Sequence, residues 1–518
     1  MSKNRLITNI LFGFLIVLFI FRIIFINQID LIPEETYYWQ WSRHLSLSYY
    51  DMSPMIAYII ALTTFFGRLN SQFFVRLGAP IISLFISLFV YFILKKLTSN
   101  KIYSLGAAVL INVIPIFNIG SILIVYGNAQ LLFFSLSIFF LIYLIISKKD
   151  YYIYLIGMSV GFALLSKYTA VFLYPVVFLF FLLSNNYRKY LFKKEPYIAF
   201  LISLILFSPV IIWNYLNNYV SLRHLFALSG NYVNFNTFIY NLFLFIISQA
   251  GILSPFIFII LIFSMFYGLY KGIKNRNDIY LALSISAMVP FVYFVYQCAK
   301  TEVQPNWPVF LYFPAYILAS LLFFQYYNNK NNKLKKGISK KLAASALSIS
   351  IIVGLVFSVL IFIEPSHPII NFKLDKSPIR DILGWKKLGY AVDKIIAANK
   401  KDKFLISARR FQIASELAYY VKGKPQTYSF NYFKRNNEYS LWNNFKTKKG
   451  QNFLYIIDTK FGKHIEKELS QNFKKYKLIK KLTIRHSGHK VRTIKIYGLY
   501  DFLYKNKYLF KKFASKQF

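Results

Sequence analysis

The sequence predicts a polytopic α-helical membrane protein that ends in a small α/β domain. The chain has 518 residues, is 57% hydrophobic, and contains several apolar runs of the roughly 18 residues or more that can cross a bilayer as a helix. In lipid the backbone must satisfy its own hydrogen bonds, so these runs have to be helices. After residue 364 the apolar runs stop and the composition becomes strongly basic. We therefore place a membrane domain at 1–364 and an extracytoplasmic α/β domain at 365–518.

About eleven hydrophobic segments are candidates for membrane crossing. The first lacks a small-residue cleavage site, so we expect a retained helix rather than a signal peptide. The fifth and sixth are short, and the eighth is long enough to be kinked or split. The segments are 7–27, 73–94, 102–119, 128–147, 152–166, 168–184, 197–214, 239–270, 279–297, 307–326 and 342–363.

The positive charges give these segments an orientation. With a cytoplasmic N-terminus, the inner connections carry 20 Lys and Arg residues and the outer connections carry 5, as the positive-inside rule requires. The segment 55–70 is apolar but short, so we expect it to lie along the outer surface. Residues 28–72 are then one outer loop, with interfacial helices joined around 51–54. Eleven crossings leave the C-terminal domain outside.

The C-terminal part shows the alternation typical of an α/β domain. Short apolar strands are predicted at 404–408, 452–458 and 493–500, and an amphipathic helix at 384–399. The whole chain has a formal net charge of +43. In a membrane protein, anionic lipid headgroups and phosphates are better partners for this charge than nucleic acid. The one cysteine, Cys298, excludes a disulfide within the chain and is expected to be a passive core residue.

Acidic residues are scarce in the membrane part, and three of the eight before residue 364 lie in the first outer loop: Glu34, Glu35 and Asp51. Sugar transfer to a hydroxyl or a phosphate needs a carboxylate to take the acceptor's proton. Acids beside aromatic residues at a membrane edge therefore predict a sugar or lipid-phosphate site. The neighbouring aromatic residues, which we expect to line the substrate, are Tyr37, Tyr38, Trp39, Tyr49 and Tyr50.

Cations that could steady a leaving phosphate lie on the same predicted side of the membrane. Lys167 lies between two short hydrophobic segments, where an ionisable residue is a functional candidate. Arg223 and His224 are weaker candidates, because outer loops also carry unrelated charges. The six histidines show no paired spacing, and no nucleotide-binding fingerprint is present. We therefore predict no metal site and no nucleotide.

Each candidate has a purely structural alternative. Glu34 and Glu35 follow Pro33, and acids in the first turn of a helix are favourable against its dipole. Asp51 precedes a Ser-Pro pair and could be a turn residue. The aromatic residues could form an ordinary interfacial belt, and Lys167 could extend its amine to the membrane surface.

Several motifs in order give the chain a resemblance to bacterial membrane glycosyltransferases of the GT-C superfamily. This superfamily includes the protein O-mannosyltransferase-like group, with the aminoarabinose transferase of lipid A and the galacturonate transferases of lipopolysaccharide core. The motifs are PEETYYWQWSRHLSLSYYDMSPMIAY (33–58), GFALLSKYTA (161–170), SPVIIWNYLNNYVS (208–221), PNWP (305–308), GW (384–385), ASELAYYVKGKP (414–425) and EYSLW (438–442).

The resemblance implies transfer of a sugar from a polyprenyl-phosphate donor, on the periplasmic face of the bacterial inner membrane. The acceptor it implies is an envelope glycolipid such as lipid A or lipopolysaccharide. The alternatives are transfer to protein, and a non-catalytic transporter of the lipid-linked sugar, although transporters tend to show internal repeats and none is seen here. The resemblance requires no cofactor, but some members bind a divalent metal.

The resemblance also assigns roles to residues. Glu34 and Glu35 match the acids of the family's DEAYYW motif, one of which activates or orients the acceptor, while Asp51 would orient a cation or the loop. Relatives often carry an acid where this chain has Asn128, which cannot act as a base at neutral pH. The substrate-lining residues implied beyond the loop are Asn128, Asn306 and Trp307, and the donor-phosphate ligands are Lys167, Arg223 and His224.

Overall fold

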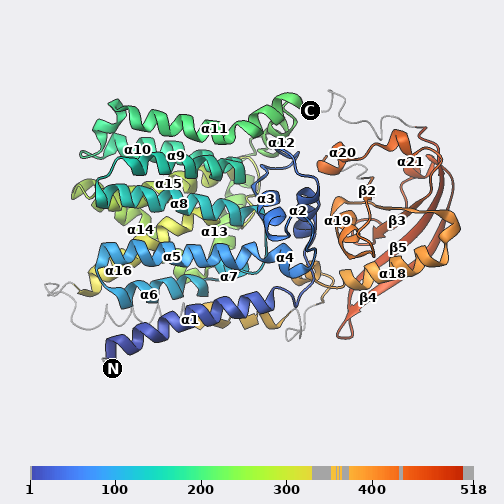
Figure 1. Cartoon of the computed structure of the whole chain (residues 1–518), viewed down its shortest axis with the longest axis horizontal. Helices are drawn as coiled ribbons and strands as arrows, with labels where there is room; N and C mark the ends of the chain where they lie inside the picture. Colours follow the sequence, from blue (N-terminus) through green and yellow to red (C-terminus); the bar gives the residue numbers. More distant parts are fainter. Residues whose placement is uncertain are drawn as a thin grey trace. The chain divides into compact units, whose positions relative to one another are not determined.

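The computed structural model describes residues 3–328, 352–356, 359–360, 362–364, 373–430 and 436–505, and Figure 1 shows its elements. The contacts divide the chain into two compact units. The first consists of Met1–Phe25, Met52–Ile59 and Arg76–Leu360. The second consists of Ile26–Asp51, Ile60–Val75 and Ile361–Phe518.

The first unit is a bundle of helices. Eight helical stretches of the described chain are long and apolar enough to cross a membrane, and shorter apolar helices accompany them, which confirms the predicted class. The helices are α1 (Lys3–Phe25), α5 (Gly78–Thr98), α6 (Lys101–Leu110), α7 (Pro115–Ile119), α8 (Tyr126–Ser147), α9 (Tyr151–Ser166), α10 (Leu173–Leu183), α11 (Lys194–Leu216), α12 (Val220–Leu228), α13 (Phe235–Leu253), α14 (Pro255–Lys274), α15 (Asp278–Gln297) and α16 (Tyr312–Asn328).

The exact count of eleven spans is not confirmed. The eighth predicted span is divided into α13 and α14 at Ser254, which has φ of 78° and is followed by a proline. A left-handed residue followed by a residue without an N–H ends a helix. Most of the predicted span 342–363 lies outside the described residues.

Two glycines one helical turn apart bring α9 against α11. A Cβ atom on Gly157 would overlap the backbone of Ala199, and one on Gly161 would lie 2.7 Å from the Cβ of Leu206. Small residues with this spacing let two membrane helices approach closely. The contact fixes the end of α9, where Lys167 follows.

The second unit is built on a five-stranded mixed sheet, which confirms the predicted α/β domain. The strand order is β2-β1-β3-β5-β4; β1 runs parallel to β2 and β3, whereas β5 is antiparallel to β3 and β4. The predicted helix 384–399 is α18. The elements are β1 (Leu405–Ala408), β2 (Thr427–Ser429), β3 (Phe453–Asp458), β4 (Phe473–His486), β5 (His489–Phe502), α18 (Trp385–Ala398), α19 (Phe411–Tyr420), α20 (Glu438–Trp442) and α21 (Lys467–Ser470).

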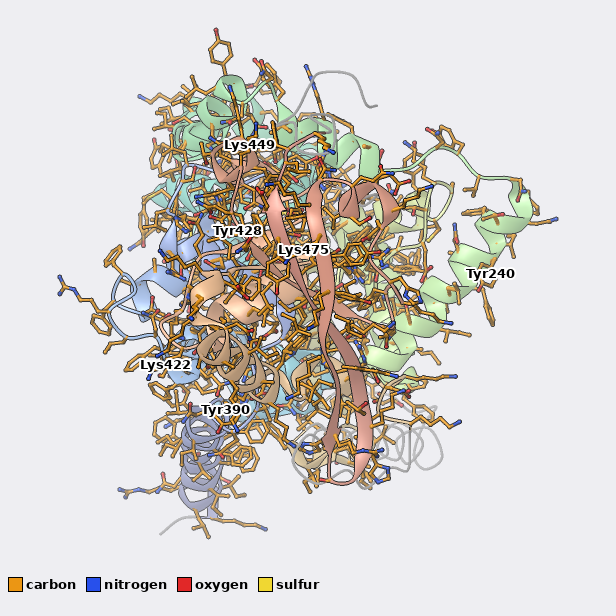
Figure 2. All side chains as sticks on the ribbon, turned by 90° about the vertical axis from the view of Figure 1, so that its right-hand side faces the viewer. Tyr240, Tyr390, Lys422, Tyr428, Lys449 and Lys475 are labelled. Carbon is orange, nitrogen blue, oxygen red and sulfur yellow. The ribbon has the colours of Figure 1, made fainter. Side chains whose placement is uncertain are left out.

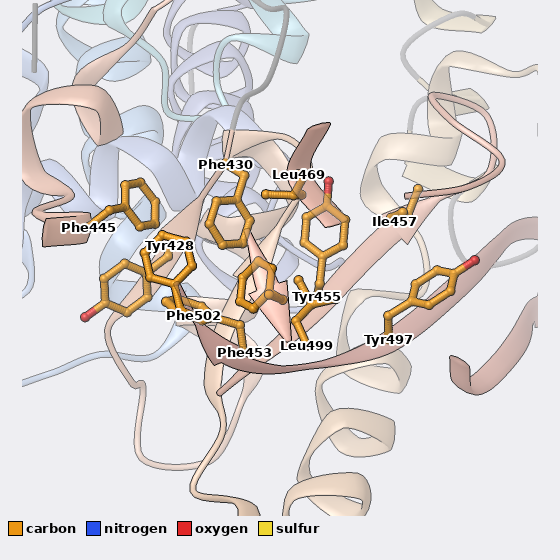
Figure 3. Close-up of a cluster of buried hydrophobic side chains, with 11 residues drawn as sticks. Tyr428, Phe430, Phe445, Phe453, Tyr455, Ile457, Leu469, Tyr497, Leu499 and Phe502 are labelled. Carbon is orange, nitrogen blue, oxygen red and sulfur yellow. The ribbon is translucent and has the colours of Figure 1, made fainter. Parts of the chain in front are cut away.

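Aromatic side chains from β3, β5 and the neighbouring segments form a core of this unit (Figure 3). Phe453 lies at its centre, with ring centroids 5.3 Å from Phe430 and 5.7 Å from Phe502. Aromatic pairs at such distances stabilise a core beyond the area they bury. The basic residues remain outside it: Lys422, Lys449 and Lys475 are exposed, and Figure 2 shows them on the surface.

Most of the first outer loop belongs to this second unit. Its helices are α2 (Pro33–Arg43), α3 (Met55–Thr63) and α4 (Gln72–Arg76), so helices do form on both sides of 51–54, as predicted. Helix α2 packs against α19. The predicted boundary at 364/365 follows the sequence composition, whereas the contacts group 26–51 and 60–75 with the C-terminal segment.

Candidate active site

Helix α2 carries the two acids predicted to be catalytic, and its start explains what one of them does. Pro33 occupies the first turn, where its missing N–H costs nothing. The Oε2 atom of Glu35 accepts a hydrogen bond from the backbone N–H of Ile32 over 2.9 Å. An acid three residues into a helix commonly caps the residue before it in this way. Glu35 is fully buried, so its carboxylate serves to cap the start of α2.

Glu34 has a different environment, because its side chain is exposed. Many protein atoms still surround its carboxyl group, and the resulting loss of water raises the pKa of Glu34, against a lowering by its own backbone N–H. Asp381 and Glu35 raise this pKa further, and Arg410 lowers it. A carboxylate that is accessible and has a raised pKa is suited to accept a proton. Of the two adjacent acids, only Glu34 has an exposed side chain, and its predicted catalytic role stays a prediction.

Asp51 is held by groups on both sides of it. Its Oδ2 accepts the hydroxyl of Tyr37 over 2.6 Å and the backbone N–H of Glu438 over 3.2 Å. The backbone N–H of Glu438 also donates to the Tyr37 hydroxyl over 2.8 Å. The carboxylate of Glu438 in turn accepts the backbone N–H of Tyr50 over 2.6 Å. Asp51 thus lies in a hydrogen-bonded group that joins the outer loop to α20, and its predicted catalytic role stays a prediction.

The aromatic residues predicted to line the substrate are buried in the second unit. Tyr49 stacks on Trp41 with ring centroids 4.3 Å apart, and its hydroxyl donates to the backbone oxygen of Trp41 over 2.9 Å. The Trp39 indole N–H donates to Asn70 over 2.9 Å. These contacts give the aromatic residues a packing role, and a substrate-lining role stays a prediction for all five: Tyr37, Tyr38, Trp39, Tyr49 and Tyr50.

The entry to α2 is anchored by one hydroxyl group. The Tyr420 oxygen accepts the backbone N–H of Leu31 over 2.7 Å and the side-chain amide of Gln72 over 2.6 Å. Gln72 also donates to the backbone oxygen of Ile29 over 3.2 Å. The position of α2 is therefore fixed by side chains that are distant in sequence.

Two further acids of this unit were not singled out from the sequence. Glu416 on α19 is 1% exposed, and neither of its carboxyl oxygens makes a hydrogen bond. Burial raises its pKa well above the ordinary value, and Asp30 raises it further while Arg492 lowers it, so the group is held neutral. Glu438, described above, is also buried. Both acids lie within the motifs 414–425 and 438–442 that carry the family resemblance. This position in the motifs is the feature of the sequence that could have identified them.

The cations predicted to bind phosphate belong to the first unit. Lys167 is buried, and its Nζ atom lies 4.9 Å from the ring centroid of Tyr126. On α12, His224 is buried and Arg223 is exposed. The next residue after Lys167, Tyr168, hydrogen-bonds Ser221 over 2.7 Å. The segments that carry Lys167 and His224 therefore meet at one end of the bundle.

Asn128 lies in the first turn of α8, in the same unit. Its Oδ1 accepts the backbone N–H of Val125 over 2.8 Å, and its Nδ2 donates to the backbone oxygen of Gly120. Both amide functions are thus used to hold the chain where α8 starts. Asn306 is exposed and Trp307 is half-buried, in the turn that leads to α16. The predicted substrate-lining role of these three residues stays a prediction.

The segment before Asn128 is fixed by a charge that the sequence analysis did not consider. Arg22 of α1 is 3% exposed and donates to Ser83, Asn112 and Asn118 over 3.0, 2.7 and 3.1 Å. A charged group inside a membrane helix has to be satisfied by neighbouring polar groups. Among the described residues, no group of three or more His, Cys, Asp or Glu side chains is arranged to hold a metal ion. The expectation that no metal is required, although some relatives bind a divalent metal, stays a prediction.

The comparisons with known proteins agree with the resemblance expected from the sequence. Residues 51–213 match the family of dolichyl-phosphate-mannose-protein mannosyltransferases. The chain resembles the GT-C glycosyltransferases. A lipid A galacturonosyltransferase, RgtD, from Rhizobium johnstonii is 26% identical over 322 residues, which cover 60% of this chain and 65% of the relative. The match thus spans slightly less than two thirds of that relative's length.

Solved structures show the same fold over nearly the whole chain. ArnT from Cupriavidus metallidurans in the apo state has a TM-score of 0.61 at 11% identity, and covers 94% of this chain and 97% of its own. ArnT bound to undecaprenyl phosphate gives the same TM-score at 12% identity, with coverages of 96% and 98%. At these identities the likeness establishes an ArnT-like fold, with a helical membrane part followed by a small sheet domain.

Proposed function

We propose that this protein is an integral-membrane glycosyltransferase that moves a sugar from a polyprenyl-phosphate donor to an envelope glycolipid. RgtD acts on lipid A, and ArnT has been solved with undecaprenyl phosphate. An ArnT-like fold together with a relative that modifies lipid A favours lipid A or lipopolysaccharide as the acceptor. The transfer would take place on the periplasmic face of a bacterial inner membrane, and no cofactor is required.

The observation that carries this proposal is the exposed Glu34 beside the buried Glu35 at the start of α2. Glu34 would accept the proton of the acceptor hydroxyl while that oxygen attacks the sugar carbon. Lys167, with Arg223 and His224, would stabilise the polyprenyl phosphate as it leaves, because preorganised cations lower the energy of developing negative charge. Asp51 would hold the loop that carries the acid.

The test uses purified protein in lipid nanodiscs, a panel of polyprenyl-phosphate sugars, and lipid A as acceptor. We expect transfer by the wild type and a loss of roughly 10²- to 10⁴-fold in Glu34→Gln, since general-base catalysis contributes about that much. Glu468→Gln, at an exposed site on α21, is the matched control and should keep its activity. No transfer by the wild type to any acceptor, or full activity in Glu34→Gln, would refute the mechanism.

The family match favours one second candidate, which is transfer to protein. Residues 51–213 match a family named for protein mannosyltransferases. The two candidates share the donor and the acid, and they differ only in the acceptor. Mass analysis of lipid A and of secreted proteins from a deletion strain separates them, because only the true acceptor loses a sugar.

A further inference from the structure

We infer that Glu438 is a positioning residue for α2, and that it forms with the half-buried Asp51 and the buried Tyr37 a hydrogen-bonded clasp on the first outer loop. All three side chains belong to the second unit. Glu438 accepts from the Tyr50 backbone, and its own backbone N–H reaches both Tyr37 and Asp51. Three hydrogen bonds thus connect Glu438 to positions that are nearly 400 residues away in sequence. The inference concerns the loop itself and rests on the proposed function only for its effect on activity.

The clasp acts on the helix that carries the candidate catalytic acid. Tyr37 lies three residues after Glu34, and side chains with this spacing share one face of a helix. Holding the Tyr37 hydroxyl therefore limits rotation of α2 and, with it, the direction of Glu34. Tyr37 also stacks on Tyr439, the residue after Glu438, with ring centroids 6.0 Å apart. The Tyr420 hydroxyl anchors the other end of the helix, before Pro33.

A purely local role for Glu438 is not supported. An acid in the first turn of a helix can serve that helix, but α20 has only five residues. Its cap is provided by Asn437, whose side chain accepts the backbone N–H of Tyr439 over 3.0 Å. The carboxylate of Glu438 is directed to Tyr50 instead, although its side chain is only 4% exposed. Burying a carboxyl group with one loop amide as the partner of its oxygen costs free energy even when the acid is neutral, which argues that this contact positions the loop.

The clasp has a built-in sensitivity to pH. Burial raises the pKa of Glu438 to about 8, the Tyr50 N–H lowers it, and the charge of Asp51 raises it. The titratable groups that interact with Glu438 are Asp51 and the Tyr37 hydroxyl. Tyr439, the next residue along the chain, interacts with the charge of Arg43. The raised pKa means that the folded state favours the protonated acid. The protonated acid therefore stabilises the clasp fully only below the ordinary carboxyl pKa, and this contribution declines as the pH rises to about 8, above which a second negative charge stands beside Asp51.

Hydrogen–deuterium exchange of the full-length protein in nanodiscs tests the clasp without any substrate. Peptides covering 45–51 report the Tyr50 amide directly. After correction for intrinsic rates, we expect Glu438→Ala to raise exchange there by about tenfold at pH 6.5, the effect of losing one buried hydrogen bond. In the wild type, exchange should rise from pH 6.5 to about 8 and then level off. Glu438→Gln, which keeps an acceptor but cannot ionise, should keep the protection and lose the pH step.

Controls and activity separate the possible outcomes. Glu468→Gln should match the wild type, and Tyr37→Phe should loosen 45–51 while peptides from β3 and β5 stay protected. Where transfer is observed, Glu438→Ala should lower kcat more than it raises KM, and Glu438→Gln should restore kcat. Unchanged exchange in Glu438→Ala and Tyr37→Phe, or a pH step that persists in Glu438→Gln, would overturn the inference. Absence of transfer by the wild type would refute the proposed function and leave the exchange result standing.

Discussion

At the scale of single residues, two adjacent acids that look equivalent in sequence have different environments. Glu35 is buried and caps the backbone of Ile32, whereas Glu34 is exposed. The sequence predicted that one of them acts on the acceptor, and it also predicted that acids here could simply favour the helix start. The structure supports the helix-start interpretation for Glu35, and the interpretation that Glu34 acts on the acceptor stays a prediction. The hydrogen-bond partner and the exposure, which no sequence pattern displays, make the difference.

A pair of substitutions at Glu35 tests this division. Glu35→Ala removes the acceptor of the Ile32 N–H and should lower the free energy of unfolding by about 1–2 kcal/mol, as measured for lost helix caps and buried hydrogen bonds. Glu35→Gln keeps an acceptor oxygen and should stay close to the wild type in both thermal stability and transfer. Thermal unfolding in detergent and the transfer assay measure the two effects. If Glu35→Gln loses transfer as completely as Glu34→Gln, with its stability unchanged, Glu35 is the reacting acid.

At the scale of elements, the position of α2 in the sequence assigns it to the membrane part, whereas its contacts assign it to the α/β unit. One hydroxyl group, that of Tyr420, accepts hydrogen bonds from both Leu31 and Gln72. Tyr420→Phe should destabilise the protein by about 1–3 kcal/mol, because the Leu31 N–H loses its acceptor and Gln72 loses one of two. Tyr390→Phe is the matched control, since Tyr390 lies exposed on α18 (Figure 2). Equal unfolding temperatures for the two variants would contradict the anchoring of α2 by Tyr420.

The strands show which elements the sequence reveals and which it hides. β1, β3 and β5 were predicted because their apolar residues are consecutive or alternate. β4 was not, because an edge strand with one free side carries lysines in place of apolar residues, including Lys475, Lys477 and Lys480. Such charges protect an edge strand from pairing with other chains. β2 has only three residues, too few for any periodicity.

The helices of the membrane part were also predictable from their apolar residues. Continuous apolar runs locate them, but the break at Ser254 depends on one left-handed residue before a proline, so the sequence indicated a split without its position. The buried carboxylates Glu416 and Glu438 were missed because burial of an acid follows from tertiary packing. Only the matched motifs around them gave a sign of their importance.

At the scale of the whole molecule, the distribution of charge predicts how the chain is oriented. With the eleven predicted spans, the inner connections carry 20 basic residues against 5 in the outer ones, which predicts that residues 95–101 are cytoplasmic and that the α/β domain is periplasmic. A polyprenyl-phosphate donor and an envelope acceptor both require the candidate acids to face the periplasm. A test of the orientation is therefore also a test of the proposed reaction.

Cysteine labelling measures this orientation directly, because the native Cys298 is buried and should remain unlabelled. Ser487 lies exposed at the turn between β4 and β5, and Ser99 lies exposed between α5 and α6. In spheroplasts, we expect a membrane-impermeant maleimide to label Ser487→Cys at once and Ser99→Cys only after the membrane is permeabilised. The reverse pattern would place Glu34 and the α/β domain on the nucleotide-sugar side of the membrane, where a lipid-linked donor has no advantage, and would contradict both the topology and the proposed reaction.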